Sequence, residues 1–313
     1  MDIKVGLLGP GSWAQQGHLP ALAAAGAVVS VVCGRDADRA RDAAQKAGIE
    51  RATTDWRGVI AGGELDALVV TTPPVAHAEP VAAALEAGLP VMSESPLAMT
   101  LADARALAAL ARERGVVTGY TRPRPFNFNG RAVVEHLAQG RIGVLRRAVF
   151  ELSGHPWLRA TPEQTWRVRA DGGPTPLAGL AAGLLVELCG PIAQIDGVLS
   201  ISDGDSNRAP DELVAHARSE SGCLVAIEAG WSRAPRMQVV LHGTEGSILW
   251  DLGAAGTVSL ATDQGWQVID EPRKEEFSAP AEFVAAVAAK RQHALGFDRA
   301  VHELELVEAL AVR

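Results

Sequence analysis

Cysteine, excess positive charge and long hydrophobic runs are all scarce in this chain of 313 residues. Its three cysteines, Cys33, Cys189 and Cys223, are far apart and form no Cys-x-x-Cys pair. They therefore indicate neither a disulfide framework nor a zinc ribbon, and we expect a reducing, cytoplasmic environment. The net charge of -8 argues against a nucleic-acid partner, because phosphate binding needs a concentrated excess of Lys and Arg.

No hydrophobic run approaches the ~20 residues that a membrane-spanning helix needs. The most apolar stretch, residues 177–189, is interrupted by Glu187 and is predicted as a buried helix. Residues 1–5 lead directly into a strand pattern without the regions of a signal peptide, so we expect neither export nor a membrane partner. The eight His residues lack zinc-binding spacing, and there is no Gly-x-Ser-x-Gly elbow of a serine hydrolase.

Residues 3 to about 119 alternate short apolar runs with Ala-rich amphipathic stretches, which predicts an α/β domain with a parallel sheet. The runs 4–8, 28–32 and 67–70 are apolar throughout, as in strands buried on both faces. Residues 36–47 and 101–112 have helical spacing, with Asp36 and Thr100 as expected N-caps.

After residue 120 the pattern changes to that of an α+β domain with a large, mostly antiparallel open sheet. The aperiodic tract 122–125, which contains two prolines, is interpreted as a connector. We therefore predict a Rossmann dinucleotide-binding domain at 1–121 and a substrate and oligomerisation domain at 122–313. The strand segments expected in the second domain are 144–152, 213–218, 223–229, 237–241, 247–250 and 266–269. Helices are expected at 281–293 and 298–312 and are predicted to pack back on the first domain.

A glycine-rich motif, Gly9-x-Gly11-x-x-Ala14, follows the first predicted strand and opens a helix. In this context the first glycine permits a tight turn, and the second lets the backbone approach a pyrophosphate. The small third residue lets helix and strand pack together, while the helix N-terminus faces the anion. The motif predicts a bound nicotinamide dinucleotide, with Ser12 and Trp13 in the same turn. The alternative is that small residues only shape a turn.

The end of the second strand favours NADP over NAD as the cofactor. An acidic residue there would bind the ribose hydroxyls and repel a 2′-phosphate. The sequence has Gly34 followed by Arg35, whose guanidinium suits a phosphate. Alternatively Arg35 is a solvated residue before a helix capped by Asp36, and NAD is then possible.

Several further motifs stand in a specific order. They are Thr71-Thr72-Pro73-Pro74-Val75-Ala76-His77, Ala84-Leu85-Glu86-Ala87-Gly88-Leu89-Pro90-Val91, Glu94-Ser95-Pro96-Leu97, Trp166-Arg167, Gly172-Gly173 and Gly243-Thr244-Glu245-Gly246-Ser247. With them the chain resembles the Gfo/Idh/MocA oxidoreductase family over almost its whole length. The resemblance implies a Rossmann domain followed by an open α/β domain, and oxidation or reduction of a sugar, inositol or related alcohol. It also implies a homodimer or homotetramer formed through the open sheet.

The resemblance further implies that Thr71, Thr72, Pro73 and His77 line the nicotinamide side of the cofactor, with Glu94 close by. Where the family usually has Glu-Lys-Pro, however, this chain has Ser95 in place of the lysine. The family's second-domain pattern, with a His and an Asp, should fall within residues 176–185, and this segment contains neither. The usual proton-transfer groups are therefore predicted to be replaced. Their loss matters because a positioned base accelerates alcohol oxidation by ~10²–10⁴.

Three residues are candidates for the missing role. Tyr120, the single tyrosine, is predicted to follow the last Rossmann strand, and its phenol could donate a proton. His155 lies on a loop after a predicted second-domain strand, and Ser95 could hydrogen-bond a substrate. The resemblance implies a cleft between the two domains near Tyr120, and His155 could face it. For Tyr120 the alternative is a packing or lid residue, for His155 a solvated loop position, and for Ser95 a space-filling side chain.

The motifs support two hypotheses about function. The first is an NAD(P)-dependent oxidoreductase of specialised or sugar-related metabolism, with reduction and NADP favoured, a small-molecule substrate and a non-standard active site. Hydride chemistry belongs to the cofactor and would survive the loss of the lysine. The second is a nucleotide-binding protein without redox turnover: a sensor, a partner regulator or a non-redox enzyme on the same scaffold.

Overall fold

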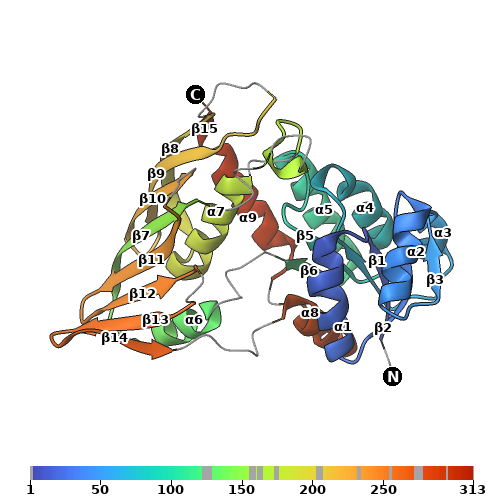
Figure 1. The fold of residues 1–313 in the computed structure, drawn as a ribbon, viewed down its shortest axis with the longest axis horizontal. Coiled ribbons are helices and arrows are strands. Elements are labelled where there is room, and N and C mark those ends of the chain that lie inside the picture. The colour runs from blue at the N-terminus through green and yellow to red at the C-terminus, as the bar shows by residue number, and fades with distance from the viewer. Residues whose placement is uncertain are drawn as a thin grey trace. The chain divides into compact units, whose positions relative to one another are not determined.

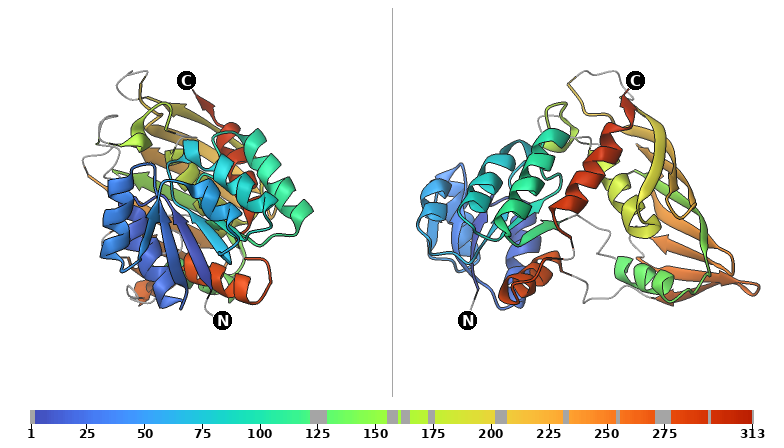
Figure 2. Two further views of the ribbon diagram at one scale, coloured as in Figure 1. Left: turned by 90° about the vertical axis from the view of Figure 1, so that its right-hand side faces the viewer. Right: turned by 180° about the vertical axis from the view of Figure 1, so that it is seen from behind.

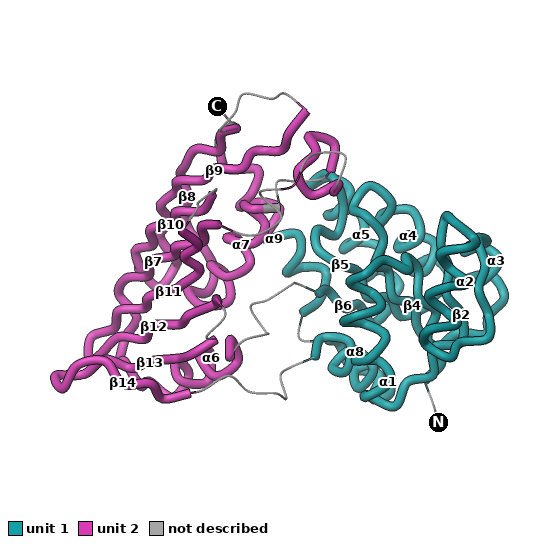
Figure 3. The backbone as a smooth tube through the Cα atoms, in the orientation of Figure 1, with its two compact units in different colours: residues 1–121, 278–302 teal, residues 122–277, 303–313 magenta. Residues whose placement is uncertain are grey.

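The computed structural model describes residues 3–121, 129–154, 160, 165–172, 176–201, 207–230, 234–253, 256–270, 278–293 and 295–312. The chain divides into two compact units (Figure 3). One unit comprises residues 1–121 and 278–302, and the other comprises residues 122–277 and 303–313. The first unit is thus assembled from both ends of the chain. The predicted connector at 122–125 lies outside the described residues.

The first unit contains a six-stranded sheet in the order β3-β2-β1-β4-β5-β6, and all its neighbouring strands are parallel (Figure 1). Its strands are β1 Lys4–Leu8, β2 Val28–Cys33, β3 Arg51–Thr53, β4 Ala67–Val70, β5 Val91–Glu94 and β6 Thr118–Thr121. Every residue of β4 is buried, which explains its continuous apolar run. The predicted strands at 4–8, 28–32 and 67–70 are confirmed. The prediction that Tyr120 follows the last strand is wrong, because this residue lies inside β6.

Helices cover the sheet of this unit (Figure 2). They are the π-helical turn η1 Ala14–His18, α1 Leu19–Ala24, α2 Ala37–Lys46, α3 Trp56–Ala61, the 3₁₀ turn η2 Pro74–Ala76, α4 Ala78–Glu86, α5 Leu101–Arg114, α8 Ala279–Ala288 and the start of α9 Phe297–Glu308. The predicted N-caps are confirmed: Asp36 accepts hydrogen bonds from the backbone at the start of α2, and Thr100 does so at the start of α5.

Helix α8 completes the hydrophobic core of the first unit. Phe283 is fully buried in one cluster with Leu7, Leu22 and Val69. A Cβ atom on Gly119 of β6 would lie 2.8 Å from the Phe283 ring, so the strand and the helix can approach only because residue 119 is glycine. The predicted helix at 281–293 is shorter in the structure, ending at Ala288, and the one predicted at 298–312 ends at Glu308.

The second unit contains a nine-stranded sheet in the order β14-β13-β12-β11-β7-β10-β9-β8-β15. Only the β7–β10 and β8–β15 pairs are parallel. Its strands are β7 Leu145–Ser153, β8 Ile192–Ser200, β9 Glu212–Ser219, β10 Leu224–Gly230, β11 Arg236–Gly243, β12 Ser247–Asp251, β13 Val258–Thr262, β14 Gly265–Asp270 and β15 Ala311–Val312. Each of the six strand segments predicted here falls on an observed strand, whereas β8, β13 and β15 were not predicted.

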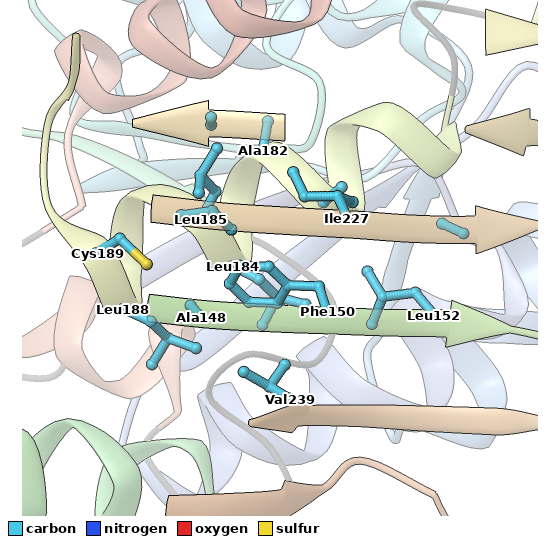
Figure 4. Close-up of a cluster of buried hydrophobic side chains, with 14 of the residues drawn as sticks. Ala148, Phe150, Leu152, Ala182, Leu184, Leu185, Leu188, Cys189, Ile227 and Val239 are labelled. Atoms are coloured by element: carbon cyan, nitrogen blue, oxygen red, sulfur yellow. The ribbon is translucent and has the colours of Figure 1, made fainter. Parts of the chain in front are cut away.

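One face of this sheet is covered by α7 Pro176–Cys189 (Figure 4). Leu184 and Leu185 pack with Phe150 and Ile227 in the core, which confirms the predicted buried helix. The other helical elements of the unit are α6 Gly130–Ala138 and the 3₁₀ turn η4 Trp166–Val168. Strand β9 alternates buried and exposed residues, so the opposite face of the sheet is open. In the described part of the chain, no helix combines the length and apolarity needed to span a membrane.

Candidate functional site

The carboxyl ends of the parallel strands bring most predicted site residues of the first unit to one edge of its sheet. The strand order reverses direction between β1 and β4, and dinucleotides bind at such a switch point in open α/β sheets. The residues that follow or end these strands are Gly9, Gly11, Ser12 and Trp13 after β1, Gly34 and Arg35 after β2, Thr71, Thr72 and Pro73 after β4, Glu94 and Ser95 at β5, and Tyr120 in β6.

The two glycines of the turn after β1 have different roles. Gly9 has φ +104°, and a Cβ atom there would lie 2.6 Å from the backbone nitrogen of Thr72. Only glycine fits this position. Gly11 has no atom within 4 Å of the place where its Cβ would stand, so space remains open beside its backbone. A turn tied closely to the sheet, with an open approach at the helix start, fits the pyrophosphate of a dinucleotide.

The loop after β4 is held by its own hydroxyl groups. The Thr71 hydroxyl donates to the carbonyl oxygen of Gly9 at 2.6 Å, joining the ends of β1 and β4. The Thr72 hydroxyl donates to the carbonyl oxygen of Ala76 at 3.1 Å. Pro73 is exposed, whereas both threonines are half-buried. This loop therefore offers a pre-shaped wall at the sheet edge.

His77 is fully buried beneath that wall. Its Nδ1 lies 2.7 Å from the carbonyl oxygen of Pro96, and its Nε2 lies 2.6 Å from that of Thr72. Burial lowers the pKa of His77, and the two carbonyl contacts act in the opposite direction. The side chain joins the loops after β4 and β5. It does so from the interior of the unit.

Glu94 is the centre of a buried polar cluster. Its Oε1 accepts hydrogen bonds from the Trp13 indole at 3.0 Å and from the Thr121 hydroxyl at 2.5 Å. The His18 Nε2 atom lies 2.5 Å from the same oxygen. Trp13 precedes the π-helical turn η1 and His18 ends it, and both side chains contact the same carboxylate oxygen. Their rings meet edge-on, with centroids 6.4 Å apart.

This cluster keeps Glu94 ionised despite its burial. Burial by itself would raise the pKa of Glu94, but the hydrogen bonds from His18, Thr121 and Trp13 outweigh it and hold the pKa below the usual value. The Nδ1 atom of His18 is buried without a hydrogen-bond partner among the described residues. The arrangement orients Trp13, which is 39% exposed beside the glycine turn.

The second polar contact at this edge joins Tyr120 and Ser95. The Tyr120 phenol donates to Ser95 Oγ at 2.9 Å. Tyr120 is buried and Ser95 is only partly so. Two of the three predicted catalytic residues therefore contact each other. The third, His155, lies outside the described residues.

At the end of β2, Gly34 has a packing reason to be glycine. A Cβ atom would lie 2.9 Å from the ring of Pro10, so this position cannot carry the acidic side chain that would bind ribose hydroxyls. Asp36 is committed to capping α2: backbone N–H bonds, chiefly from Arg39, lower its pKa. Arg35 is exposed.

The thiol of Cys33, at the end of β2, is neutral, because burial raises its pKa to about 11.

His18 and Thr121 are site residues that the sequence analysis missed. A lone histidine in an apolar helix and a threonine at a strand end carry no motif. Their roles become visible only through the π-helical turn and through the register that pairs Glu94 with Thr121. Among the described residues, no group of three His, Cys, Asp or Glu side chains could hold a metal ion.

Comparison with known families gives two matches that together span most of the chain. Residues 3–121 match an oxidoreductase family with an NAD-binding Rossmann fold, and residues 131–249 match the GFO/IDH/MocA C-terminal domain.

Similar proteins of stated function include both dehydrogenases and reductases, most of them of sugars or sugar derivatives. The levoglucosan dehydrogenase of Pseudarthrobacter phenanthrenivorans is 26% identical over 308 residues, covering 84% of this chain and 77% of the relative. The 1,5-anhydro-D-fructose reductase of Ensifer adhaerens is 28% identical over 279 residues, covering 83% of this chain and 80% of the relative. A dTDP-3,4-didehydro-2,6-dideoxy-alpha-D-glucose 3-reductase of Saccharopolyspora spinosa is 30% identical over 295 residues, covering 90% and 83%. A 3-ketoreductase of Actinomadura kijaniata, solved with NADP and TDP-benzene, superposes with a TM-score of 0.84 at 22% identity, covering 100% of this chain and 98% of the other.

Proposed function

The chain belongs to the Gfo/Idh/MocA family of NAD(P)-dependent oxidoreductases, and we propose that it is an NADPH-dependent reductase of a carbonyl group in a sugar-like small molecule. The observation that carries this proposal is the contact of Tyr120 and Ser95 at the same sheet edge as the glycine turn. Hydroxyl groups in the neutral form supply protons, as a reduction requires. A bound NADPH would supply the hydride.

The preference for NADPH is supported by the end of β2. Gly34 presents no carboxylate, Asp36 is occupied as the cap of α2, and the exposed guanidinium of Arg35 is available in the same loop. A 2′-phosphate beside Arg35 would meet a cation, with no free acidic side chain at position 34 to repel it.

Reduction is favoured over alcohol oxidation by the residues at the family's catalytic positions. Ser95 stands where the family usually has lysine, and residues 176–185 provide no His or Asp. Glu94, the neighbouring carboxylate, is engaged by Trp13 and His18. We propose that this non-standard set serves substrates whose carbonyl needs only a hydride and a proton.

We further propose a homodimer or homotetramer that forms through the open face of the nine-stranded sheet. Val198 and Val214 are cross-strand neighbours on that face and are both exposed, as is Leu224. Apolar side chains on an open sheet suit burial against a second copy. The proposed surroundings are a reducing cytoplasm, which three free cysteines suit, without nucleic-acid or membrane partners.

The proposal is tested by binding and turnover. NADPH should quench Trp fluorescence and bind more tightly than NADH. Consumption of NADPH should then be followed with 1,5-anhydro-D-fructose, other keto sugars, imines and enones, and the reverse reaction with sugar alcohols and NADP. We expect turnover with at least one carbonyl compound. Tight NADPH binding without turnover in any class would instead favour a sensor, a partner regulator or a non-redox enzyme.

A further inference from the structure

Ser95 and Tyr120 are placed so that only one of them can meet a substrate. Strands β5 and β6 are parallel neighbours, with Ser93 paired with Tyr120. The phenol nevertheless reaches Ser95, two residues further toward the carboxyl edge of the sheet. Tyr120 is 1% exposed, whereas Ser95 is partly open at that edge. The hydroxyl of the buried tyrosine therefore contacts the hydroxyl of the more exposed serine.

We propose that Ser95 and Tyr120 form a two-hydroxyl proton relay that protonates the oxygen of the carbonyl group being reduced. This inference rests on the reductase function proposed above. Ser95 Oγ gives its proton to the substrate oxygen and takes the phenolic proton of Tyr120. The carbonyl carbon gains a hydride, the oxygen gains a proton and the product is an alcohol. Tyr120 is left as a phenolate and, once the product has left, regains a proton from water by way of the Ser95 hydroxyl.

The chemistry requires both hydroxyls. A serine hydroxyl is too weak an acid to lose its proton without replacement, while a phenol has an unperturbed pKa of about 10 and can supply one. The Tyr120 phenol lies 2.9 Å from Ser95 Oγ, which is close enough for the phenolic proton to pass to the serine oxygen. Ser95 is the residue that touches the substrate, and Tyr120 acts through it.

Other ionisable groups around the pair are already engaged. Glu94 precedes Ser95, but its carboxylate is ionised and accepts from Trp13, His18 and Thr121. His77 contacts the carbonyl oxygen of Pro96. His293 contacts that of Leu295, which also accepts the Tyr120 N–H. No proton donor other than Tyr120 is seen at Ser95 Oγ among the described contacts.

A direct readout exists because Tyr120 is the only tyrosine in the chain. Ultraviolet absorbance of the phenolate during a pH titration therefore reports this residue alone. In Ser95→Ala the phenolate loses a hydrogen-bond donor, so its ionisation should move to higher pH by about one unit. Ser95→Thr should restore the wild-type titration. Ser30→Ala, a half-buried serine of β2, is the matched control and should leave it unchanged. An unshifted titration in Ser95→Ala would overturn the relay.

Kinetics with NADPH and 1,5-anhydro-D-fructose, or a faster panel substrate, test the same inference. Tyr120→Phe and Ser95→Ala should each lower kcat by about a hundredfold, with NADPH affinity retained. The double variant should be no slower than either single one, because the two groups act as a unit. In the wild type, activity should fall at high pH as Tyr120 ionises, and this limb should vanish in Tyr120→Phe.

The possible failures are distinguishable. Wild-type turnover with additive losses in the double variant, or with an unchanged kcat in both single variants, would overturn the relay and leave the reductase function standing. Absence of wild-type turnover with every carbonyl compound would overturn the function and the relay together. Loss of NADPH binding in Tyr120→Phe would mean that the tyrosine is needed for packing of the site. The Ser95→Ala titration would then show whether Ser95 interacts with the Tyr120 phenolate.

Discussion

At the scale of the residue, the proposed preference for NADPH depends on the side chain of Arg35. Replacing Arg35 with Ala should weaken NADPH binding by about tenfold or more, which corresponds to losing roughly 1.4 kcal/mol from a charge-assisted phosphate contact. NADH binding should change little. Fluorescence titration of both nucleotides measures the effect. Arg41→Ala is the matched control, because this exposed arginine of α2 pairs with Asp38 within the helix. Equal losses for NADPH and NADH in Arg35→Ala would remove the argument for NADP.

Glu94 makes stability depend on pH. Its folded-state pKa lies below the usual 4.5, so its charge stabilises the fold above that pH, and this contribution is lost as the pH falls through the folded value. Glu94→Gln should lower the free energy of unfolding by about 1–3 kcal/mol at neutral pH, since the buried charged group that contacts Trp13, His18 and Thr121 is lost. The deficit should shrink on acidification.

Urea unfolding at neutral and acid pH measures this effect. The matched control is Glu86→Gln, an exposed carboxyl on α4, which should change stability by no more than about 0.5 kcal/mol. A deficit in Glu94→Gln that stays constant down to acid pH would mean that the carboxylate charge is not what the cluster uses.

At the scale of the element, the turn after β1 contains two glycines with different expected effects: substitution of Gly9 should affect stability, and substitution of Gly11 should affect NADPH binding. Gly9→Ala should destabilise the first unit by about 2 kcal/mol or more, because a Cβ would strike the Thr72 backbone at a positive φ. Gly11→Ala meets open space and should leave stability within about 0.5 kcal/mol. It should still weaken NADPH binding by at least about tenfold, because its methyl group stands where the pyrophosphate approaches.

Thermal unfolding and NADPH titration of both variants check this pair. Wild-type NADPH affinity in Gly11→Ala would show that the nucleotide does not lie against this turn. A fully stable Gly9→Ala would contradict the close contact between the ends of β1 and β4.

The elements that could be predicted are those whose local pattern is sufficient. Strand β4 is buried on both faces and consists of four apolar residues. The glycine turn is identified by its sequence motif. Strand β8 was missed because the exposed Gln194 and Asp196 and the half-buried Gly197 interrupt its apolar run. The contact of Tyr120 with Ser95 depends on the register between β5 and β6, which no local pattern specifies.

At the scale of the whole molecule, the open sheet face predicts self-association. Val214→Glu should raise the dissociation constant of the proposed dimer by at least about a hundredfold, because its carboxylate would be buried in the interface beside Val198 and Glu228, the cross-strand neighbours of residue 214. Analytical ultracentrifugation measures this. Val75→Glu, an exposed valine of η2 in the first unit, is the control and should leave the assembly intact. A wild-type protein that sediments as a monomer at micromolar concentration would refute the assembly.

The discontinuous first unit also has a consequence for how the protein is made. The ribosome finishes β6 long before it reaches α8, so the nascent chain emerges without the Phe283 side chain that packs against Gly119. The carbonyl of Leu295, which holds the Tyr120 N–H, is made later still. The edge of the sheet that carries Tyr120 can therefore be completed only when almost all of the second unit has been synthesised. A chain that terminates early would carry the glycine turn on a half-covered core, exposed to chaperones and proteases.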